Sequence, residues 1–132
     1  MSYNIGEAAR ASGVSAKMIR HYESIGLTGA AKRSGSGYRV YTEQDVRVLQ
    51  FIHRGRELGF SLDQIADLLA LWQDTGRASQ DVRALALQHI EELDQKIAQM
   101  QSMRETLVQL ASSCRGDKRS ECPILADLAS HP

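Results

Sequence analysis

The 132-residue sequence has little that would cross-link it covalently or place it in a membrane. It contains two cysteines and two prolines, its aromatic content is 5%, and its formal net charge is zero. No apolar run approaches the roughly 18 residues that a bilayer span requires. The first residues, Met1 to Asn4, have neither the basic nor the apolar region of a signal peptide. We therefore expect a cytoplasmic protein with one modest core, which excludes most multidomain enzymes.

The zero net charge is the sum of two unlike halves. Residues 1–60 carry nine Lys and Arg against five Asp and Glu, whereas residues 61–132 carry seven against eleven. A basic N-terminal half suits a polyanionic partner, and an acidic C-terminal half suits a different task. The charge distribution therefore indicates a chain that binds a polyanion at one end.

Two short helical segments open the chain. The first is predicted over residues 5–11, residues 12–14 break it, and Ser15 is a good N-cap for a second helix through Ile25. On the second helix, Ile19 and Ile25 are expected to face the core. Two short helices joined by a tight glycine-containing turn are typical of a helix-turn-helix, whose second helix can enter the major groove of DNA.

A small hairpin and two further helices follow. The segment 31–41 has a Gly-Ser-Gly centre flanked by basic and β-favouring residues, which predicts a two-stranded wing. Thr42 then caps a third helix, with Asp45 at the capping-box position. Gly59 ends that helix and Ser61 begins a fourth. The first half of the chain is therefore expected to be mainly α, with one wing.

A long helix occupies the middle of the acidic half. From about Gln80 to Ser112 there is neither Gly nor Pro, which predicts a rod of about 45 to 50 Å. Apolar residues recur along it at alternating spacings of three and four, interrupted by Arg104. They are Ile90, Leu93, Ile97, Met100, Leu107 and Ala111. Because no other part of so short a chain can cover this stripe, we expect a homodimer that buries it in a coiled coil.

The two cysteines, Cys114 and Cys122, lie too close together to cross-link a secreted fold, so in a reducing compartment they indicate a metal or redox site. Cu(I) and Ag(I) are soft ions that suit thiolates, and two sulfurs allow near-linear coordination, whereas zinc usually takes four ligands. Pro123 at the first helical position places Cys122 at an N-cap, where backbone N–H groups favour a thiolate. Basic residues outnumber acidic ones by one in the loop between the two cysteines, and their positive charge also favours the thiolate form.

Several short motifs are distinctive. Residues 5–9 read Ile-Gly-Glu-Ala-Ala, 19–23 read Ile-Arg-His-Tyr-Glu, 37–41 read Gly-Tyr-Arg-Val-Tyr, and 58–62 read Leu-Gly-Phe-Ser-Leu. Together they resemble the MerR family of transcriptional regulators, and the C-terminal Cys-x7-Cys-Pro-Ile resembles its copper-efflux regulator branch, which senses monovalent coinage metals. The resemblance covers nearly the whole chain.

The resemblance implies a mainly α fold in three parts. A winged helix-turn-helix DNA-binding domain spans residues 1–72, a dimerisation helix in an antiparallel coiled coil spans 80–112, and a metal-binding loop with a short helix spans 113–132. The implied partners are double-stranded promoter DNA, RNA polymerase at the promoter, and a second copy of the chain. The implied DNA contacts are Lys17, Arg20 and Tyr22 on the second helix, Arg33, Tyr38 and Arg39 on the wing, and Arg56 beyond it. His21 is either a contact residue or a partly packed side chain.

The same resemblance implies one Cu(I) ion, with Ag(I) or Au(I) as alternatives, for each pair of Cys114 and Cys122. Divalent-metal sensors of the family place a cysteine where this chain has Ser79, and the intercysteine loop has no histidine. His131 in the C-terminal tail is a weaker candidate ligand. The implied function is activation of metal-efflux genes through metal-driven distortion of promoter DNA.

Two other functions fit part of the sequence. A thiol–disulfide switch would use the same two cysteines, and a metal carrier or storage protein would need no DNA. The helix-turn-helix and the wing argue against the carrier. Since the sequence has no nucleophile–base pair, phosphate loop or open metal site, we predict that it is not an enzyme.

Overall fold

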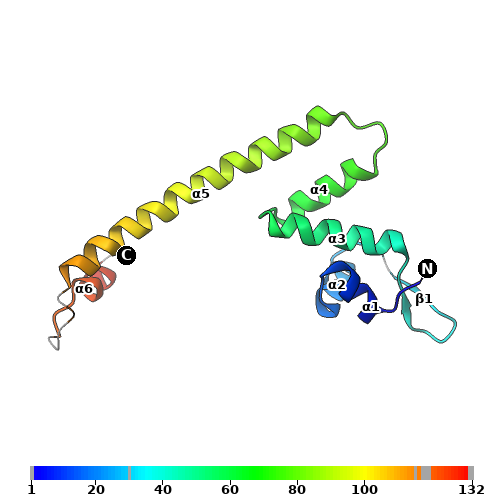
Figure 1. The fold of residues 1–132 in the computed structure, drawn as a ribbon, viewed down its shortest axis with the longest axis horizontal. Coiled ribbons are helices and arrows are strands. Elements are labelled where there is room, and N and C mark those ends of the chain that lie inside the picture. Colours follow the sequence, from blue (N-terminus) through cyan, green and yellow to red (C-terminus); the bar gives the residue numbers. More distant parts are fainter. Residues whose placement is uncertain (1, 30, 115, 117–119, 131–132) are drawn as a thin grey trace. The chain divides into compact units, whose positions relative to one another are not determined.

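The computed structural model describes residues 2–29, 31–114, 116 and 120–130. The chain divides into two compact units, Met1–Val82 and Arg83–Pro132. Its elements, coloured along the chain in Figure 1, are α1 (Ile5–Ser12), α2 (Ala16–Ser24), β1 (Lys32–Arg33), β2 (Arg39–Val40), α3 (Glu43–Glu57), α4 (Leu62–Gln73), α5 (Ser79–Ser113) and α6 (Pro123–Ser130). The predicted mainly α fold is confirmed.

The helices of the first unit start where the sequence places capping side chains. At the start of α2, Ser15 Oγ accepts a hydrogen bond of 3.2 Å from a backbone N–H three residues on. At the start of α3, Thr42 and Asp45 exchange hydrogen bonds of 2.8 and 3.1 Å. Ser61 and Gln64 form the same reciprocal pair at the start of α4. These caps satisfy N–H groups that the first turn of a helix leaves without partners, so the predicted helix starts are confirmed.

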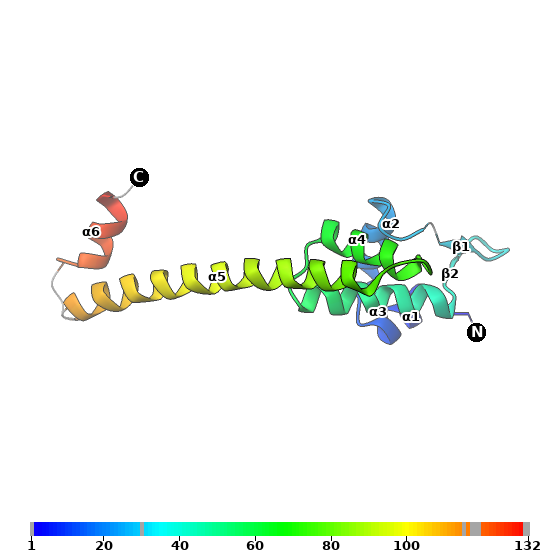
Figure 2. The same ribbon diagram turned by 90° about the horizontal axis from the view of Figure 1, so that it is seen from above.

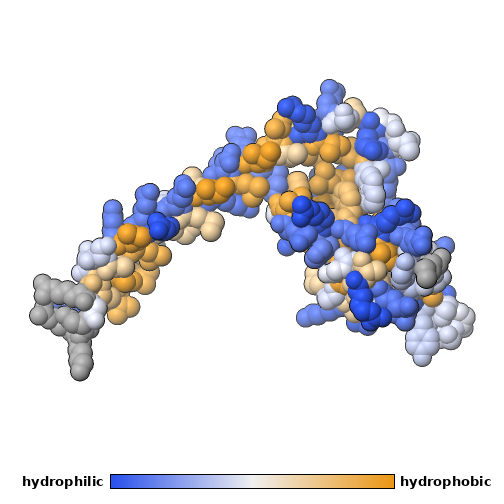
Figure 3. Space-filling model, in the orientation of Figure 1, coloured by the Kyte–Doolittle hydropathy of each residue, from blue (hydrophilic) through white to orange (hydrophobic). Residues whose placement is uncertain are grey.

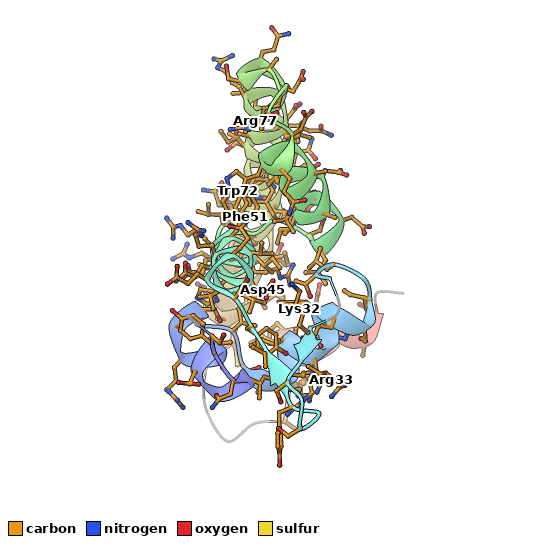
Figure 4. The ribbon with its side chains drawn as sticks, turned by 90° about the vertical axis from the view of Figure 1, so that its right-hand side faces the viewer. Lys32, Arg33, Asp45, Phe51, Trp72 and Arg77 are labelled. Atoms are coloured by element: carbon orange, nitrogen blue, oxygen red, sulfur yellow. The ribbon has the colours of Figure 1, made fainter. Side chains whose placement is uncertain are left out.

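The core of the first unit lies among its four helices, with α3 packed against both α1 and α4. The buried apolar side chains are Ala8, Val14, Ile19, Tyr22, Tyr41, Val46, Leu49, Ile52, Ile65 and Leu69. Beside this core, Phe51 of α3 stacks on Trp72 of α4, with ring centroids 4.7 Å apart and planes 8° from parallel (Figure 4). The stack adds an aromatic contact to the α3–α4 packing.

Helix α2 ends at Ser24, one residue earlier than predicted. Ile25 is its C-cap, with φ −93° and ψ 1°, and this residue is 49% exposed. The prediction that Ile25 faces the core is therefore wrong. The chain turns at Gly26, whose φ of 77° ends the helical register, and Leu27 packs against the core instead.

Helix α5 runs without interruption for 35 residues (Figure 2), a length of about 52 Å. The predicted apolar stripe is visible along it in Figure 3. Its members Ile90, Ile97, Met100 and Leu107 are each more than half exposed. The long helix thus presents an accessible apolar face. In the described part of the chain, α5 included, no helix combines the length and apolarity that a membrane span needs.

Candidate functional site

Helix α2 has one buried face and one exposed face. Ile19 and Tyr22 are buried in the core of the first unit. On the other side, Arg20 and His21 lie three and four residues after Lys17, and all three side chains are exposed. A recognition helix needs this arrangement, because one face must pack on the domain while the other reaches the base edges.

Tyr22 and His21 differ in what they offer to DNA. Tyr22 is 5% exposed and belongs to the core, so it has the least free surface of the predicted contact residues. His21 is exposed, and its ring centroid lies 6.1 Å from that of Tyr22. Of the two arrangements considered for His21, the structure has the accessible one.

Strands β1 and β2 form the predicted wing and pair antiparallel, with Arg33 opposite Arg39. Arg33 lies on β1 (Figure 4), and its Nη1 donates to the Gly37 carbonyl oxygen at 2.9 Å. Gly37 has a φ of 88°, a backbone conformation that glycine adopts without steric cost. The next residue, Tyr38, is 75% exposed. The wing therefore presents a basic strand and an accessible aromatic ring.

A carboxylate of α2 holds Arg39, the third predicted contact of the wing. Arg39 Nε donates to Glu23 Oε2 at 3.2 Å, and the Tyr41 hydroxyl donates to Glu23 Oε1 at 2.6 Å. The exposed fraction of the side chain is 11% for Glu23 and 32% for Arg39. Burial raises the pKa of Tyr41, and its hydrogen bond to Glu23 and the negative charge of Glu23 raise it further, so the phenol remains a donor.

Sequence reasoning missed Glu23. Its two partners are 16 and 18 residues away along the chain, beyond the reach of helix periodicity or capping rules. The available signal was that Glu23 is the acidic residue of an otherwise basic recognition helix.

Arg56 lies in the last turn of α3 and is exposed. Its Nη1 donates to the Phe60 carbonyl oxygen at 2.9 Å, which stabilises the turn between α3 and α4. A guanidinium has five N–H donors, so this bond leaves others for a phosphate.

The two thiols meet between α5 and α6. Cys114 follows the last residue of α5, and Cys122 directly precedes Pro123, the first residue of α6. Both cysteines are free and half-buried. The pKa of Cys122 is lowered, most of all by a hydrogen bond from the backbone N–H of Leu125. Partial burial raises this pKa, whereas hydrogen bonds with the Ile124 N–H and the Cys114 thiol lower it further. The predicted N-cap position of Cys122 is confirmed.

The other residues that were predicted to contribute to this site lie outside the described residues or at the opposite end of α5. The basic residues Arg115, Lys118 and Arg119 of the loop, and the candidate ligand His131, lie outside the described residues. Ser79 is the first residue of α5 and is exposed. Within the described ranges, no group of three or more His, Cys, Asp or Glu side chains gathers as a metal site would.

Two family models match the chain. The model described as MerR HTH family regulatory protein matches residues 3–72, and the model described as MerR, DNA binding matches residues 46–110. This chain belongs to the MerR family. The predicted resemblance is confirmed, and the helix-turn-helix and wing described above lie within the matched residues.

Relatives in the MerR family resemble the chain over most of its length. Heavy metal-dependent transcription regulator 2 of Rhizobium meliloti is 56% identical over 127 residues, covering 96% of this chain and 86% of the relative. The HTH-type transcriptional regulator CueR of Escherichia coli is 39% identical over 126 residues, covering 96% and 93%. Among solved structures, that of the transcription regulator PbrR691 from Ralstonia metallidurans in complex with lead(II) matches with a TM-score of 0.80 at 32% identity, covering 96% of this chain and 98% of that one.

Membership of the MerR family makes this protein a DNA-binding transcriptional regulator. The relatives are named as regulators rather than as enzymes. Within the MerR fold, α2 and the wing form the candidate DNA interface, and the cysteine pair forms the candidate sensing site.

Proposed function

We propose that this protein activates metal-efflux and detoxification genes in response to a monovalent coinage-metal ion. The proposed ion is Cu(I), with Ag(I) or Au(I) as alternatives, and each pair of Cys114 and Cys122 holds one. The R. meliloti relative, whose name states that it is heavy metal-dependent, supports regulation by a metal. The resemblance of the Cys-x7-Cys-Pro-Ile motif to the copper-efflux branch supports a monovalent ion.

The thiol pair is the observation that carries the proposal. Cys114 and Cys122 lie within hydrogen-bond reach of each other, and the N–H groups at the start of α6 favour the thiolate form of Cys122. Two thiolates and a monovalent ion together carry one negative charge, which these N–H groups offset. Two thiolates suit a soft monovalent ion, whereas zinc usually takes four ligands and this chain has only two cysteines.

The proposed DNA interface combines α2 and the wing. Lys17, Arg20 and His21 are exposed where a recognition helix would meet base edges. The proposed backbone contacts are Arg33, Tyr38, Arg39 and Arg56. In this proposal Tyr22 supports the recognition helix from the core, because its ring is almost fully buried.

The exposed stripe on α5 supports a homodimer. Ile90 and Ile97 recur at the spacing of a coiled-coil seam and are each about half exposed, at 51% and 53%. An antiparallel coiled coil between two copies of α5 would bury this face and join two DNA-binding units.

The coupling element that we propose is α6. Its side chains Leu125 and Leu128 are exposed. An apolar groove of about 430 Å³ lies on the surface of α5, lined by Met100, Met103, Arg104, Leu107, Val108 and Ala111. When both thiols engage the ion, the start of α6 is fixed, and its apolar face can pack on the dimer helices. This packing would favour an activating conformer that bends and untwists promoter DNA for RNA polymerase.

The test is transcription from the protein's own upstream promoter with purified RNA polymerase and copper(I). Wild-type protein should increase the transcript when copper(I) is added, and Cys122→Ser should bind the promoter without responding. Ser120→Ala is the matched control, because it changes an exposed side chain two residues before Cys122 and leaves both thiols in place, and it should respond like the wild type. Copper activation by Cys122→Ser would overturn the proposal.

A thiol–disulfide switch is the second candidate, because both thiols are free and the Cys114 thiol interacts with Cys122. In that case, an oxidant without metal should change the transcript, and copper(I) under strictly reducing conditions should not. The opposite pattern supports the metal-responsive function.

A further inference from the structure

Glu23 is an acidic residue at the junction of the recognition helix and the wing. A carboxylate beside a phosphate backbone weakens DNA binding by charge repulsion, so its presence there calls for another role. We propose that Glu23 is a positioning residue for DNA recognition, which sets the wing against α2 and orients the Arg39 guanidinium, so that operator specificity depends on a side chain that does not itself contact DNA. This inference rests on the proposed DNA interface.

The contacts of Glu23 connect two different elements. One carboxylate oxygen accepts from Arg39 on β2, and the other accepts from Tyr41, the residue after Val40, which ends β2. Tyr41 is fixed in turn, because its backbone N–H and carbonyl pair with those of Tyr3 at 2.8 Å each. Glu23 therefore ties the recognition helix to the anchored base of the wing, and the exposed turn of the wing extends from that base.

The contact with Glu23 also prepares Arg39 for a phosphate. Only Nε of the guanidinium is used by the carboxylate, so the Nη groups of the planar fork can donate to DNA in a set direction. A side chain that is already oriented loses less conformational entropy on binding. The ion pair also compensates the charge of Arg39, so the wing attracts every duplex less strongly than its arginines alone would suggest.

A purely stabilising role explains the arrangement less well. The Arg39 side chain is 32% exposed, and ion pairs that reach solvent add little to stability. Burial and Glu23 raise the pKa of Tyr41, whereas the charges of Arg39 and Arg20 oppose that rise. Arg20 of the recognition helix thus lies within electrostatic reach of the same cluster. The cluster joins predicted contact residues of α2 to those of the wing.

The test uses the 132-residue protein and an operator duplex that the wild type selects from a random pool. It compares binding to this operator with binding to an unrelated duplex over a range of salt. In Glu23→Gln, Arg39 loses its compensating charge, so the slope of log affinity against log salt should become more negative by about 0.9. The ratio of operator to unrelated affinity should fall by about tenfold, the size of one lost hydrogen bond to a charged group, because a correctly placed phosphate contact fixes the register of the recognition helix on the operator. Tyr41→Phe keeps both charges but removes one donor, so it should lower the ratio and leave the slope unchanged.

Asp67→Asn is the matched control, because it removes the same charge from an exposed position on α4. It should leave the ratio at the wild-type value. If Glu23 acts through Arg39, then adding Glu23→Gln to Arg39→Ala should lower the ratio little further. Thermal melts of each variant, at one protein concentration, report on folding. If Glu23→Gln does not fold, Tyr41→Phe carries the test.

The outcomes separate this inference from the function on which it rests. Suppose that the wild type prefers its operator and that folded Glu23→Gln and Tyr41→Phe have the same ratio of operator to unrelated affinity as the wild type. The positioning role of Glu23 is then overturned, and the proposed DNA interface is not. A fall in the ratio that is as large in Asp67→Asn as in Glu23→Gln also overturns it, because charge alone would then explain the effect. Failure of the wild type to prefer any duplex overturns the proposed interface, and the inference with it.

Discussion

Replacing Gly13 with alanine tests the turn that positions the recognition helix. Gly13 has a φ of 80°, and the left-handed backbone conformation costs an L-residue about 1–2 kcal/mol. An added Cβ would lie 3.2 Å from two atoms of the His53 ring, closer than an ordinary van der Waals contact. Because the His53 side chain is 44% exposed, it can move away at small cost. We expect Gly13→Ala to lower the free energy of unfolding by about 1.5 kcal/mol, mostly through the backbone.

Two other glycines separate the causes. Gly26 has a φ of 77°, and no described atom lies within 4 Å of a Cβ added there, so Gly26→Ala should cost about 1 kcal/mol from the backbone alone. Gly35 also has open space in the described structure but no positive φ, so Gly35→Ala should be close to neutral. Urea unfolding measures the differences, with all variants at one concentration because the stability of a dimer depends on it.

Equal stability of Gly13→Ala and Gly35→Ala would refute the backbone argument. A loss in Gly13→Ala that far exceeds the loss in Gly26→Ala would refute the assumption that His53 moves. In that case, His53→Ala should remove the excess.

Two further predictions concern the second unit. Ile97→Glu places a charge in the exposed stripe of α5, so sedimentation should show monomers where the wild type is dimeric; a dimer as stable as the wild type would contradict the coiled coil. In Cys114→Ser, Cys122 is the one remaining thiol, and the N–H groups of α6 keep its pKa below the ordinary value. Its alkylation by iodoacetamide should therefore begin at lower pH in the folded protein than in guanidinium chloride, and identical pH profiles would exclude the N-cap effect.

Local structure could be predicted from the sequence because its causes lie within a few residues. Ser15, Thr42 and Ser61 each start a helix, and Pro123 starts α6. The reciprocal cap between Asn4 and Glu7 obeys the same rule and could have been found, since an acidic residue follows Asn4 at the right spacing.

Contacts between distant parts of the chain were harder to predict. The burial of Tyr22 has a local signal, because it lies three residues after the buried Ile19 on α2. For Glu23 the sequence shows only an acidic residue on a basic helix, and its partners depend on β2 returning to the recognition helix. The position of Cys122 could be predicted from the following proline, whereas its interaction with Cys114 brings together residues at the ends of two different helices.

Selection of a monovalent ion by the thiol pair is what distinguishes the proposed function from that of a divalent-metal regulator. The most direct measurement is transcription from the protein's own promoter across Cu(I), Ag(I), Au(I), Zn(II) and Hg(II), with each free ion buffered over the same range. We expect activation by monovalent ions, through Cys114 and Cys122, and little or none by zinc. A zinc response as strong as the copper response would contradict it.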